Sequence, residues 1–286
     1  MNYRHAYHAG GFADVIKHVV LSLVIVHLRQ KPAAFRLLDT HAGAGLYDLT
    51  SPEAQKTGEA ETGIHALIRT LAAATLAAPI QDLLRPYREA IAGFNPQGGL
   101  KTYPGSPALA CALMRPVDRL IACETEPTAA AALARNLAAD RRAKAIAIDG
   151  WTALAAYLPP KERRGAVLID PPFEDSHEFP RLADALAAAR RKWADGIYLA
   201  WYPLKNKDAS DAFARRVART GLPNILRAEL TVAPHAAAER LAGTGLLIVN
   251  PPWRLDEQLR ILLPALAEVL GSAQGASRID WLTSQK

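Results

Sequence analysis

Short aliphatic runs alternate with longer amphipathic stretches through most of the 286 residues. The first long stretch repeats hydrophobic residues at helical spacing and predicts a helix from about Phe12 to Arg29. The short runs predict seven strands, at 35–38, 119–123, 145–148, 165–169, 196–202, 225–232 and 245–249. This alternation is typical of an α/β sheet, and the short link between the last two strands predicts a hairpin in which one member is antiparallel.

Acidic residues stand at the ends of four predicted strands, in an informative order. They are Asp39, Glu124, Asp149 and Asp170. The carboxyl ends of parallel strands meet at one edge of an α/β sheet, where ligands bind. Gly43 and Gly45 follow the first strand, and glycines let the backbone approach a bound group closely. The series resembles the cofactor motifs of class I S-adenosylmethionine methyltransferases, which implies a Rossmann-like sheet of seven strands with the last one antiparallel.

Each motif residue has a chemical role in such a site. The Glu124 carboxylate suits the two ribose hydroxyls of the cofactor, and Asp149 can accept a hydrogen bond from its adenine amine. Ser106 precedes Pro107 at a predicted helix start, so the amino end of that helix can face the cofactor carboxylate. No third glycine completes the dinucleotide motif, which argues against a dehydrogenase.

The run GAVLIDPPF, from Gly165 to Phe173, predicts a buried strand that two prolines end, because proline cannot donate a ladder hydrogen bond. Asp170 and the Pro171 carbonyl offer hydrogen-bond acceptors, and Phe173 offers a flat apolar face. These groups suit a nucleobase that carries an exocyclic amine, with the methyl donor in line beside Asp170. The run resembles the Asp/Asn-Pro-Pro-aromatic motif of amino-group nucleic-acid methyltransferases. Turn chemistry alone is the alternative explanation.

A second copy of this motif, Asn250-Pro251-Pro252-Trp253, follows the seventh predicted strand. Both copies fit the pattern, so their positions must decide between them. The catalytic copy is expected after the fourth strand, behind the glycine turn and the cofactor acids. We therefore predict that Asp170 is catalytic and that residues 250–253 form a structural turn.

Two further segments are candidates for substrate contact. Residues 1–11 combine basic and aromatic side chains, including Tyr3 and His5, which suits nucleic acid; a frayed polar terminus is the alternative. Residues 46–104 separate the glycine turn from the next sheet element and contain two predicted helices, at about 61–73 and 80–94. We expect a small helical subdomain, inserted into a single domain of 286 residues, that acts as a lid or binds substrate.

Composition narrows the class of protein only modestly. The formal charge is +6 and the pI is near 9.4, a lean toward a polyanionic partner. Two cysteines and the absence of a His-Glu-x-x-His pattern indicate neither a disulfide framework nor a metal site. No secretory signal or membrane span is visible, so we expect a cytoplasmic protein.

Basic clusters are spread along the chain from residue 141 onward. They are Arg141-Arg142, Lys161-Arg163-Arg164, Arg190-Arg191-Lys192, Lys205-Lys207 and Arg215-Arg216. Most are expected to be solvated charges on helices and loops. Clusters at the carboxyl edge of the sheet could steer RNA, and Lys205 and Lys207 fit that place best.

Seven segments together resemble the RlmJ family, which methylates adenine N6 in 23S ribosomal RNA. They are YRHAYHAG, ADVIKHVV, LDTHAGAG, YPGSP, IDPPF, WYP and VNPPW. The resemblance implies cofactor contacts by His18, His41, Ser106, Glu124, Asp149 and Gly150. It implies that Tyr3 and Lys17 act at the catalytic edge, and that a monomer acts on naked or partly assembled RNA.

Two other functions are compatible with these motifs. A DNA adenine or protein-amide methyltransferase would use the same Asp/Asn-Pro-Pro-aromatic motif. A non-catalytic RNA-binding protein could retain the fold, although the intact acids Asp39, Glu124 and Asp149 argue against it.

Overall fold

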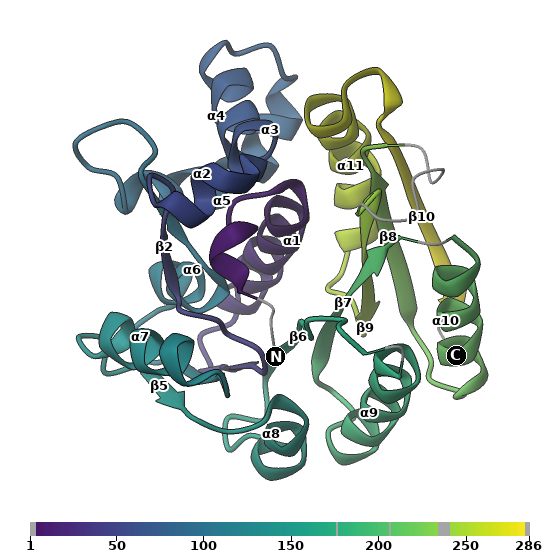
Figure 1. The fold of residues 1–286 in the computed structure, drawn as a ribbon. Coiled ribbons are helices and arrows are strands. Elements are labelled where there is room, and N and C mark those ends of the chain that lie inside the picture. Colours follow the sequence, from purple (N-terminus) through teal and green to yellow (C-terminus); the bar gives the residue numbers. More distant parts are fainter. Residues whose placement is uncertain (1–3, 176, 206, 234–240, 284–286) are drawn as a thin grey trace.

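An eight-stranded sheet forms the centre of the computed structural model, which describes residues 4–175, 177–205, 207–233 and 241–283. The strand order is β10-β8-β9-β7-β6-β1-β4-β5 (Figure 1). The strands are β1 (Arg36–Asp39), β4 (Arg119–Cys123), β5 (Ala143–Ile146), β6 (Gly165–Ile169), β7 (Ile197–Leu204), β8 (Ile225–Thr231), β9 (Gly243–Val249) and β10 (Ala276–Thr283).

The predicted sheet is confirmed in type, and the prediction of seven strands is wrong by one. Strands β5, β4, β1, β6 and β7 are parallel, and β9 is antiparallel to both β7 and β8, as expected for the seventh strand. The unpredicted β10 pairs antiparallel with β8 at the edge of the sheet. Its residues are partly or fully exposed, so the sequence lacks the apolar run of a buried strand. Strand β5 begins two residues before its predicted start.

Helices cover both faces of the sheet (Figure 1). One face carries α1 (Phe12–Arg29), α6 (Ser106–Leu113), α7 (Pro127–Leu137) and α11 (Leu255–Gly271), and the other carries α8 (Gly150–Tyr157), α9 (Glu178–Lys192) and α10 (Lys207–Arg219). Short 3-10 turns, η1 (His5–Tyr7) and η2 (Ser272–Gln274), precede α1 and follow α11. Alternate strand residues enter two separate cores: Leu37 and Leu168 face α1, whereas Leu38 and Val167 face α9.

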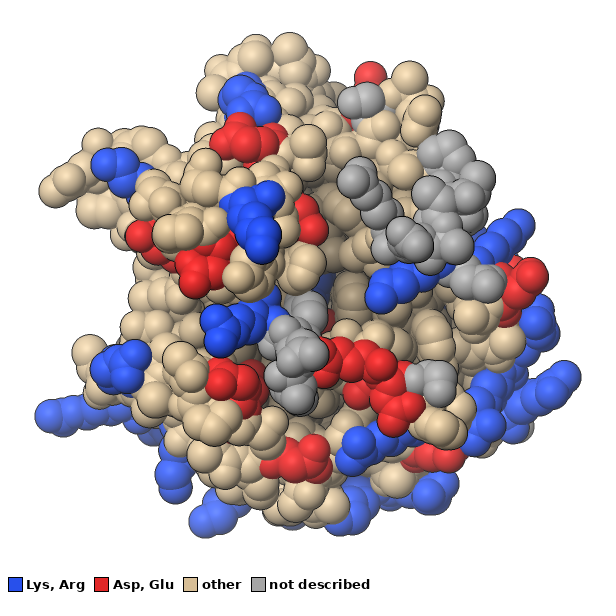
Figure 2. Space-filling view, viewed as in Figure 1, with Lys and Arg blue, Asp and Glu red and all other residues tan. Residues whose placement is uncertain are grey.

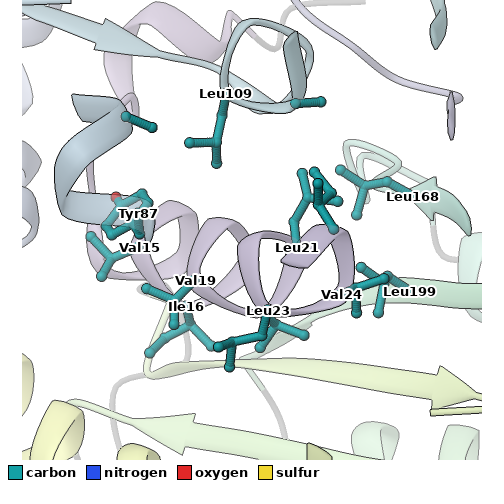
Figure 3. Packing of buried hydrophobic residues seen from close by; sticks show 14 of the residues in the cluster. Val15, Ile16, Val19, Leu21, Leu23, Val24, Tyr87, Leu109, Leu168 and Leu199 are labelled. Carbon is teal, nitrogen blue, oxygen red and sulfur yellow. The ribbon is translucent and has the colours of Figure 1, made fainter. Parts of the chain in front are cut away.

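Helix α1 has the predicted bounds but is more deeply buried than a surface helix. Val15, Val20 and Ile25 each have 0% exposure although they lie on different sides of the helix. In Figure 3, side chains of α1 lie toward Tyr87 on one side and toward Leu168 and Leu199 of the sheet on another. A helix that is apolar all round must be covered on all sides, and the covering includes the segment between β1 and α6.

That segment contains β2 (Leu46–Asp48), α2 (Pro52–Thr57), α3 (Glu59–Thr62), α4 (Ile64–Ala72), α5 (Ala78–Gly93) and β3 (Thr102–Pro104). Strands β2 and β3 pair antiparallel, so the segment leaves and rejoins the main fold at neighbouring points. The first predicted helix, at about 61–73, is divided at Gly63. A Cβ there would lie 2.1 Å from the Gly10 carbonyl oxygen, so only glycine admits this close approach. No helix among the described residues has the length and hydropathy to cross a bilayer.

Candidate active site

The four predicted acids lie at one edge of the sheet, which we call the carboxyl edge. Asp39 is the last residue of β1, and Glu124 and Asp170 directly follow β4 and β6. Asp149 lies three residues beyond β5 and caps helix α8, where its carboxylate accepts hydrogen bonds from Thr152 N (2.8 Å) and Oγ1 (2.9 Å). Because β4, β1 and β6 are adjacent and parallel, their terminal acids are neighbours in space.

The glycine turn after β1 is tied to Glu124. The Gly43 amide donates to Glu124 Oε2 at 2.9 Å, and the other carboxylate oxygen accepts from the next two amides, those of Thr125 and Glu126. Gly43 has a φ of 59°, and a Cβ there would lie 2.1 Å from the Tyr47 hydroxyl. The turn therefore requires glycine both for its conformation and for its packing.

Asp39 lies beneath the glycine turn and is 3% exposed. Ser106 Oγ donates to Asp39 Oδ2 at 2.6 Å, whereas Oδ1 has no hydrogen-bond partner among the described residues. Burial raises the pKa of this carboxyl to about 7, and the nearby Asp170 charge adds to the effect. A cavity of about 10 Å³, lined in part by Asp39 and Ser106, adjoins the pair. A buried acceptor that lacks a donor at this edge suits a ligand with N–H or O–H groups.

Gly150 and His41 meet where α8 begins. A Cβ on Gly150 would lie 2.2 Å from the Thr40 carbonyl oxygen and 2.8 Å from the His41 ring. His41 lies 2.7 Å, Nδ1 to Oγ1, from the Thr40 hydroxyl, and its ring meets Trp151 edge-on at 5.4 Å. Burial lowers the pKa of His41 to about 4, so the ring is neutral near pH 7. The result is a close-packed, uncharged wall beside Asp149.

His18 lies deeper than the other predicted cofactor residues. It is 1% exposed, and its Nδ1 lies 2.8 Å from the Tyr103 hydroxyl, which in turn lies 3.0 Å from the Tyr87 hydroxyl. Burial lowers the pKa of His18 to about 3, so it is neutral. This chain connects α1 to α5 and β3, and the predicted cofactor contact of His18 stays a prediction.

Lys17 links Asp170 to the N-terminal segment. Its ammonium contacts Asp170 Oδ2 and lies 2.8 Å from Asp14 Oδ1, and Lys17 and Asp14 are almost fully buried. Burial favours the neutral amine, but Asp14 and Asp170 outweigh it and raise the pKa of Lys17 well above its usual value. Asp14 Oδ2 lies 2.9 Å from His5 Nε2 and accepts from the Gly10 amide at 3.1 Å.

The structure therefore brings His5, Lys17 and Asp170 together through Asp14, a residue that the sequence reasoning missed. The sequence did contain a signal for Asp14, because it lies three residues before Lys17 on a mostly apolar helix. A lysine that is buried with such a helix needs an acidic partner. Tyr3, the remaining predicted substrate residue, lies outside the described residues.

Phe173 is held in an aromatic cluster next to Asp170. Its φ is 52°, and its amide donates to the Glu178 carboxylate. Its ring lies 4.8 Å from the Phe179 ring and 5.6 Å from the Trp201 ring. Phe173 also lines a pocket of about 200 Å³, together with Phe179, Pro203 and Lys205 among others. A flat ring that lines a pocket, three residues beyond Asp170, suits a base with an amine.

The second motif copy lies at the opposite edge of the sheet, because β9 runs antiparallel to β7. Asn250 has a φ of 52°, and its Nδ2 donates to the carbonyls of Ala194 and Gly196 at 2.8 Å each. Its amide thus fastens the turn before β7, as a structural role requires. Trp253 is 79% exposed and far along the chain from any of the acids.

The strand order, the antiparallel β9 and the acids at the carboxyl edge define the fold of class I S-adenosylmethionine-dependent methyltransferases. A family model described as "Ribosomal RNA large subunit methyltransferase D, RlmJ" matches residues 32–283. The chain therefore belongs to the RlmJ family.

Relatives and a solved structure agree with this membership. The chain is 36% identical to ribosomal RNA large subunit methyltransferase J of Escherichia coli K12 and 35% identical to the Haemophilus influenzae Rd protein of the same name, with complete coverage of both partners in each comparison. It also resembles the crystal structure of a Legionella pneumophila protein, with a TM-score of 0.86, 32% identity, and coverage of 96% of this chain and 98% of that one.

Proposed function

We propose that the protein transfers a methyl group from S-adenosylmethionine to the exocyclic N6 of an adenine in 23S ribosomal RNA. The observation that carries the proposal is the position of Asp170. It directly follows β6 at the carboxyl edge, next to β1 with its terminal Asp39 and the glycine turn, and it lies three residues before Phe173, which lines the pocket. The relatives that match over their full length are named as methyltransferases of large-subunit ribosomal RNA.

The residues at the carboxyl edge fit the cofactor. Glu124 offers carboxylate oxygens to ribose hydroxyls, Asp149 and Gly150 with His41 form the adenine side, and Ser106 begins α6 near the end that carries the amino acid. The orphaned Asp39 Oδ1 supplies a buried acceptor at the same edge. When bound, S-adenosylmethionine supplies an electrophilic methyl group.

Asp170 and Phe173 then position the adenine. Lys17 engages Asp170 Oδ2, so Oδ1 is the oxygen that can accept one amine hydrogen while the Pro171 carbonyl accepts the other. These acceptors rotate the nitrogen lone pair out of the ring system and aim it at the donor, and such positioning supplies much of the rate gain. Asp170 can accept the proton released afterwards or pass it to water.

Lys17 holds Asp170 in the orientation that this role requires. Its buried ammonium donates to Oδ2 of the carboxylate and so fixes the direction in which Oδ1 points. Asp14 and His5 extend the contact to the N-terminal segment, where Tyr3 is expected to close over the flipped-out base.

The segment from β2 to β3 is proposed to contact substrate at the same edge. The short 3-10 turn η1 lies against it: Thr57 Oγ1 donates to the Tyr7 carbonyl, and His8 Nδ1 lies 2.8 Å from Glu59 Oε1. The whole chain thus acts as a single domain, and we propose that it works as a monomer in the cytoplasm on RNA that ribosomal proteins do not yet cover.

Mass-spectrometric mapping of 23S ribosomal RNA, incubated with the purified protein and S-adenosylmethionine, tests the proposal. Wild type should add one N6-methyladenine at a defined position, and Asp170→Asn should reduce the rate by a factor of about 100 or more while calorimetry still detects cofactor binding. Equal methylation of a DNA duplex that competes with the RNA would contradict the assignment of RNA as the substrate. Full activity of Asp170→Asn would show that Asp170 has no role in methyl transfer.

A further inference from the structure

The carboxyl edge carries much negative charge for a surface that must receive RNA. Figure 2 shows Asp and Glu gathered around the middle of this face, with Lys and Arg more frequent along its lower and right-hand margins. The acids that follow the strands or begin the helices here are Glu124, Glu126, Asp149, Asp170, Glu174 and Asp175. Phosphates are repelled by such a rim, whereas RNA affinity depends strongly on Lys and Arg contacts to phosphates.

Positive charge collects at the opposite edge, where the parallel strands begin. We define the basic edge as the exposed Lys and Arg side chains in the connections that enter β1, β4, β5, β6 and β7. They are Arg29, Lys31, Arg119, Arg141, Lys161, Arg163, Arg191 and Lys192.

These connections form one continuous strip rather than separate clusters. Hydrogen bonds join each to the next: Leu120 N donates to the Arg142 carbonyl, Arg119 N to the Phe35 carbonyl, Arg36 N to the Arg164 carbonyl, and Trp193 Nε1 to the Arg163 carbonyl. The order follows that of the strands, β5-β4-β1-β6-β7. The strip therefore crosses five strands of the sheet.

Helix electrostatics explains only part of this strip. Arg29, Arg191 and Lys192 occupy the last turns of α1 and α9, where cations are favourable. Lys161 and Arg163 lie in the loop between α8 and β6, outside any helix, and no ion pair is found for them among the described residues. Other basic side chains here have structural contacts: Arg115 and Arg164 donate to loop carbonyls, as do Arg119 and Lys192 of the basic edge itself. The loop charges thus have no structural explanation.

We propose that the basic edge binds the phosphate backbone of a second, double-helical segment of the ribosomal RNA, remote from the target adenine. This inference rests on the proposed function. The five residues of β6 span about 17 Å, so with the flanking loops the two edges are separated by a distance that a folded RNA domain can bridge. Backbone contacts of this kind fix orientation without reading sequence. Binding at the basic edge thereby holds the target base near the carboxyl edge, whose acids by themselves repel RNA phosphates.

The double variant Lys161→Gln/Arg191→Gln tests the proposal on two substrates, protein-free 23S ribosomal RNA and a short hairpin that contains only the target adenine and its stem. The KM for the 23S RNA should rise about fivefold to tenfold. The slope of the logarithm of the RNA association constant against the logarithm of the salt concentration should become smaller in magnitude by about 1 to 2. The kcat on both substrates and the KM for the hairpin should stay within twofold of wild type.

The matched control is Arg215→Gln/Arg260→Gln, which removes the same charge from exposed positions on α10 and α11. An equal KM increase in the control, or in the test variant on the hairpin, would show a general charge effect and overturn the proposal. An unchanged KM and salt slope of the test variant on 23S RNA would also overturn the proposal. So would a test variant that loses binding to phosphatidylglycerol vesicles but keeps its binding to 23S RNA, because the basic edge would then be a membrane-binding surface.

The two proposals fail in different ways. If the wild type methylates neither RNA, the proposed function fails, and filter binding of 23S RNA by the test and control variants still decides the role of the basic edge. Selective loss of 23S binding in the test variant supports it, and equal binding by both variants rejects it.

Discussion

The charged residues near Asp170 show how pairing lowers the free-energy cost of burying charge. Lys17 is 5% exposed and has a carboxylate on each side, so neither its ammonium nor Asp14 is left unpaired. An uncompensated buried charge costs several kcal/mol, whereas a satisfied set costs far less. The resemblance to the RlmJ family implied Lys17, but only the fold shows that Asp14 connects it to His5.

Asp14→Asn should destabilise the protein by about 2–4 kcal/mol, because Lys17 would keep only one charged partner in a buried site. Urea denaturation followed by circular dichroism measures the change. The double variant Asp14→Asn/Lys17→Met also removes the buried ammonium that Asp14 pairs with, and it should lose less free energy of unfolding than the sum of the two single variants. Strict additivity would contradict the coupling of the two residues.

Gly150→Ala should weaken S-adenosylmethionine binding by at least about tenfold, because the new Cβ must displace the Thr40 carbonyl or the His41 ring. Isothermal titration calorimetry measures the affinity. Gly93→Ala is the matched control, since its Cβ would meet no atom within 4 Å and its φ is ordinary. Unchanged affinity in Gly150→Ala would show that this wall does not touch the cofactor.

At the scale of elements, prediction from sequence succeeded where a pattern was both long and locally determined. Helix α1 was predicted at its observed bounds, and six of the seven strands overlap the predicted runs closely. The exposed edge strand β10 was missed because its pairing with β8, not its hydrophobicity, makes it a strand. The division at Gly63 depends on contact with Gly10, more than 50 residues earlier, which no local pattern records.

The candidate site was predictable to a similar extent. The strand-end acids follow from the fold class, so their shared edge could be foreseen. Glu178 and the aromatic partners of Phe173 could not, because they act through tertiary contacts. Asp14 had a local signal in its spacing from Lys17, but its contact with His5 depends on the fold. The two Asp/Asn-Pro-Pro-aromatic copies lie at opposite edges of the sheet, since one follows a parallel strand and the other an antiparallel strand, and the catalytic role of Asp170 stays a prediction.

Ile25→Ala should reduce the free energy of unfolding by about 2–4 kcal/mol, because Ile25 is fully buried in α1 and its loss leaves a cavity. The neighbouring Val26 is only partly buried, so Val26→Ala should cost less than about 1 kcal/mol. Chemical denaturation of both variants provides the comparison. Similar costs would mean that α1 is exposed on more sides than the structure shows.

At the scale of the whole molecule, one sheet separates two chemically different surfaces. The carboxyl ends of the parallel strands, with the four strand-end acids, lie on one edge, and the basic loops lie on the other. The modest net charge of +6 conceals this division. Average composition therefore understates how strongly the molecule can be oriented by a polyanion.

Stability should depend on pH through Asp39. Its folded pKa of about 7 exceeds the unfolded value of about 3.9, so the folded protein retains a proton that the unfolded chain releases between these pH values. Stability from this group is therefore present below about pH 4 and is lost as the pH rises to 7. Relative to wild type without cofactor, Asp39→Asn should gain on the order of 1–3 kcal/mol between pH 4 and pH 8. Thermal unfolding across this range measures it, and parallel curves would contradict the assignment.

The burial of α1 by the segment between β2 and β3 has a consequence for Lys17. Tyr87 and Leu84 of that segment share one core with Val15 and Val19, so removal of the segment would expose apolar surface of α1 to water. Lys17 lies on the same helix and contacts Asp170. A deletion of residues 46–104 should therefore disturb the carboxyl edge through α1, even though the contact between Lys17 and Asp170 involves no residue of the deleted segment.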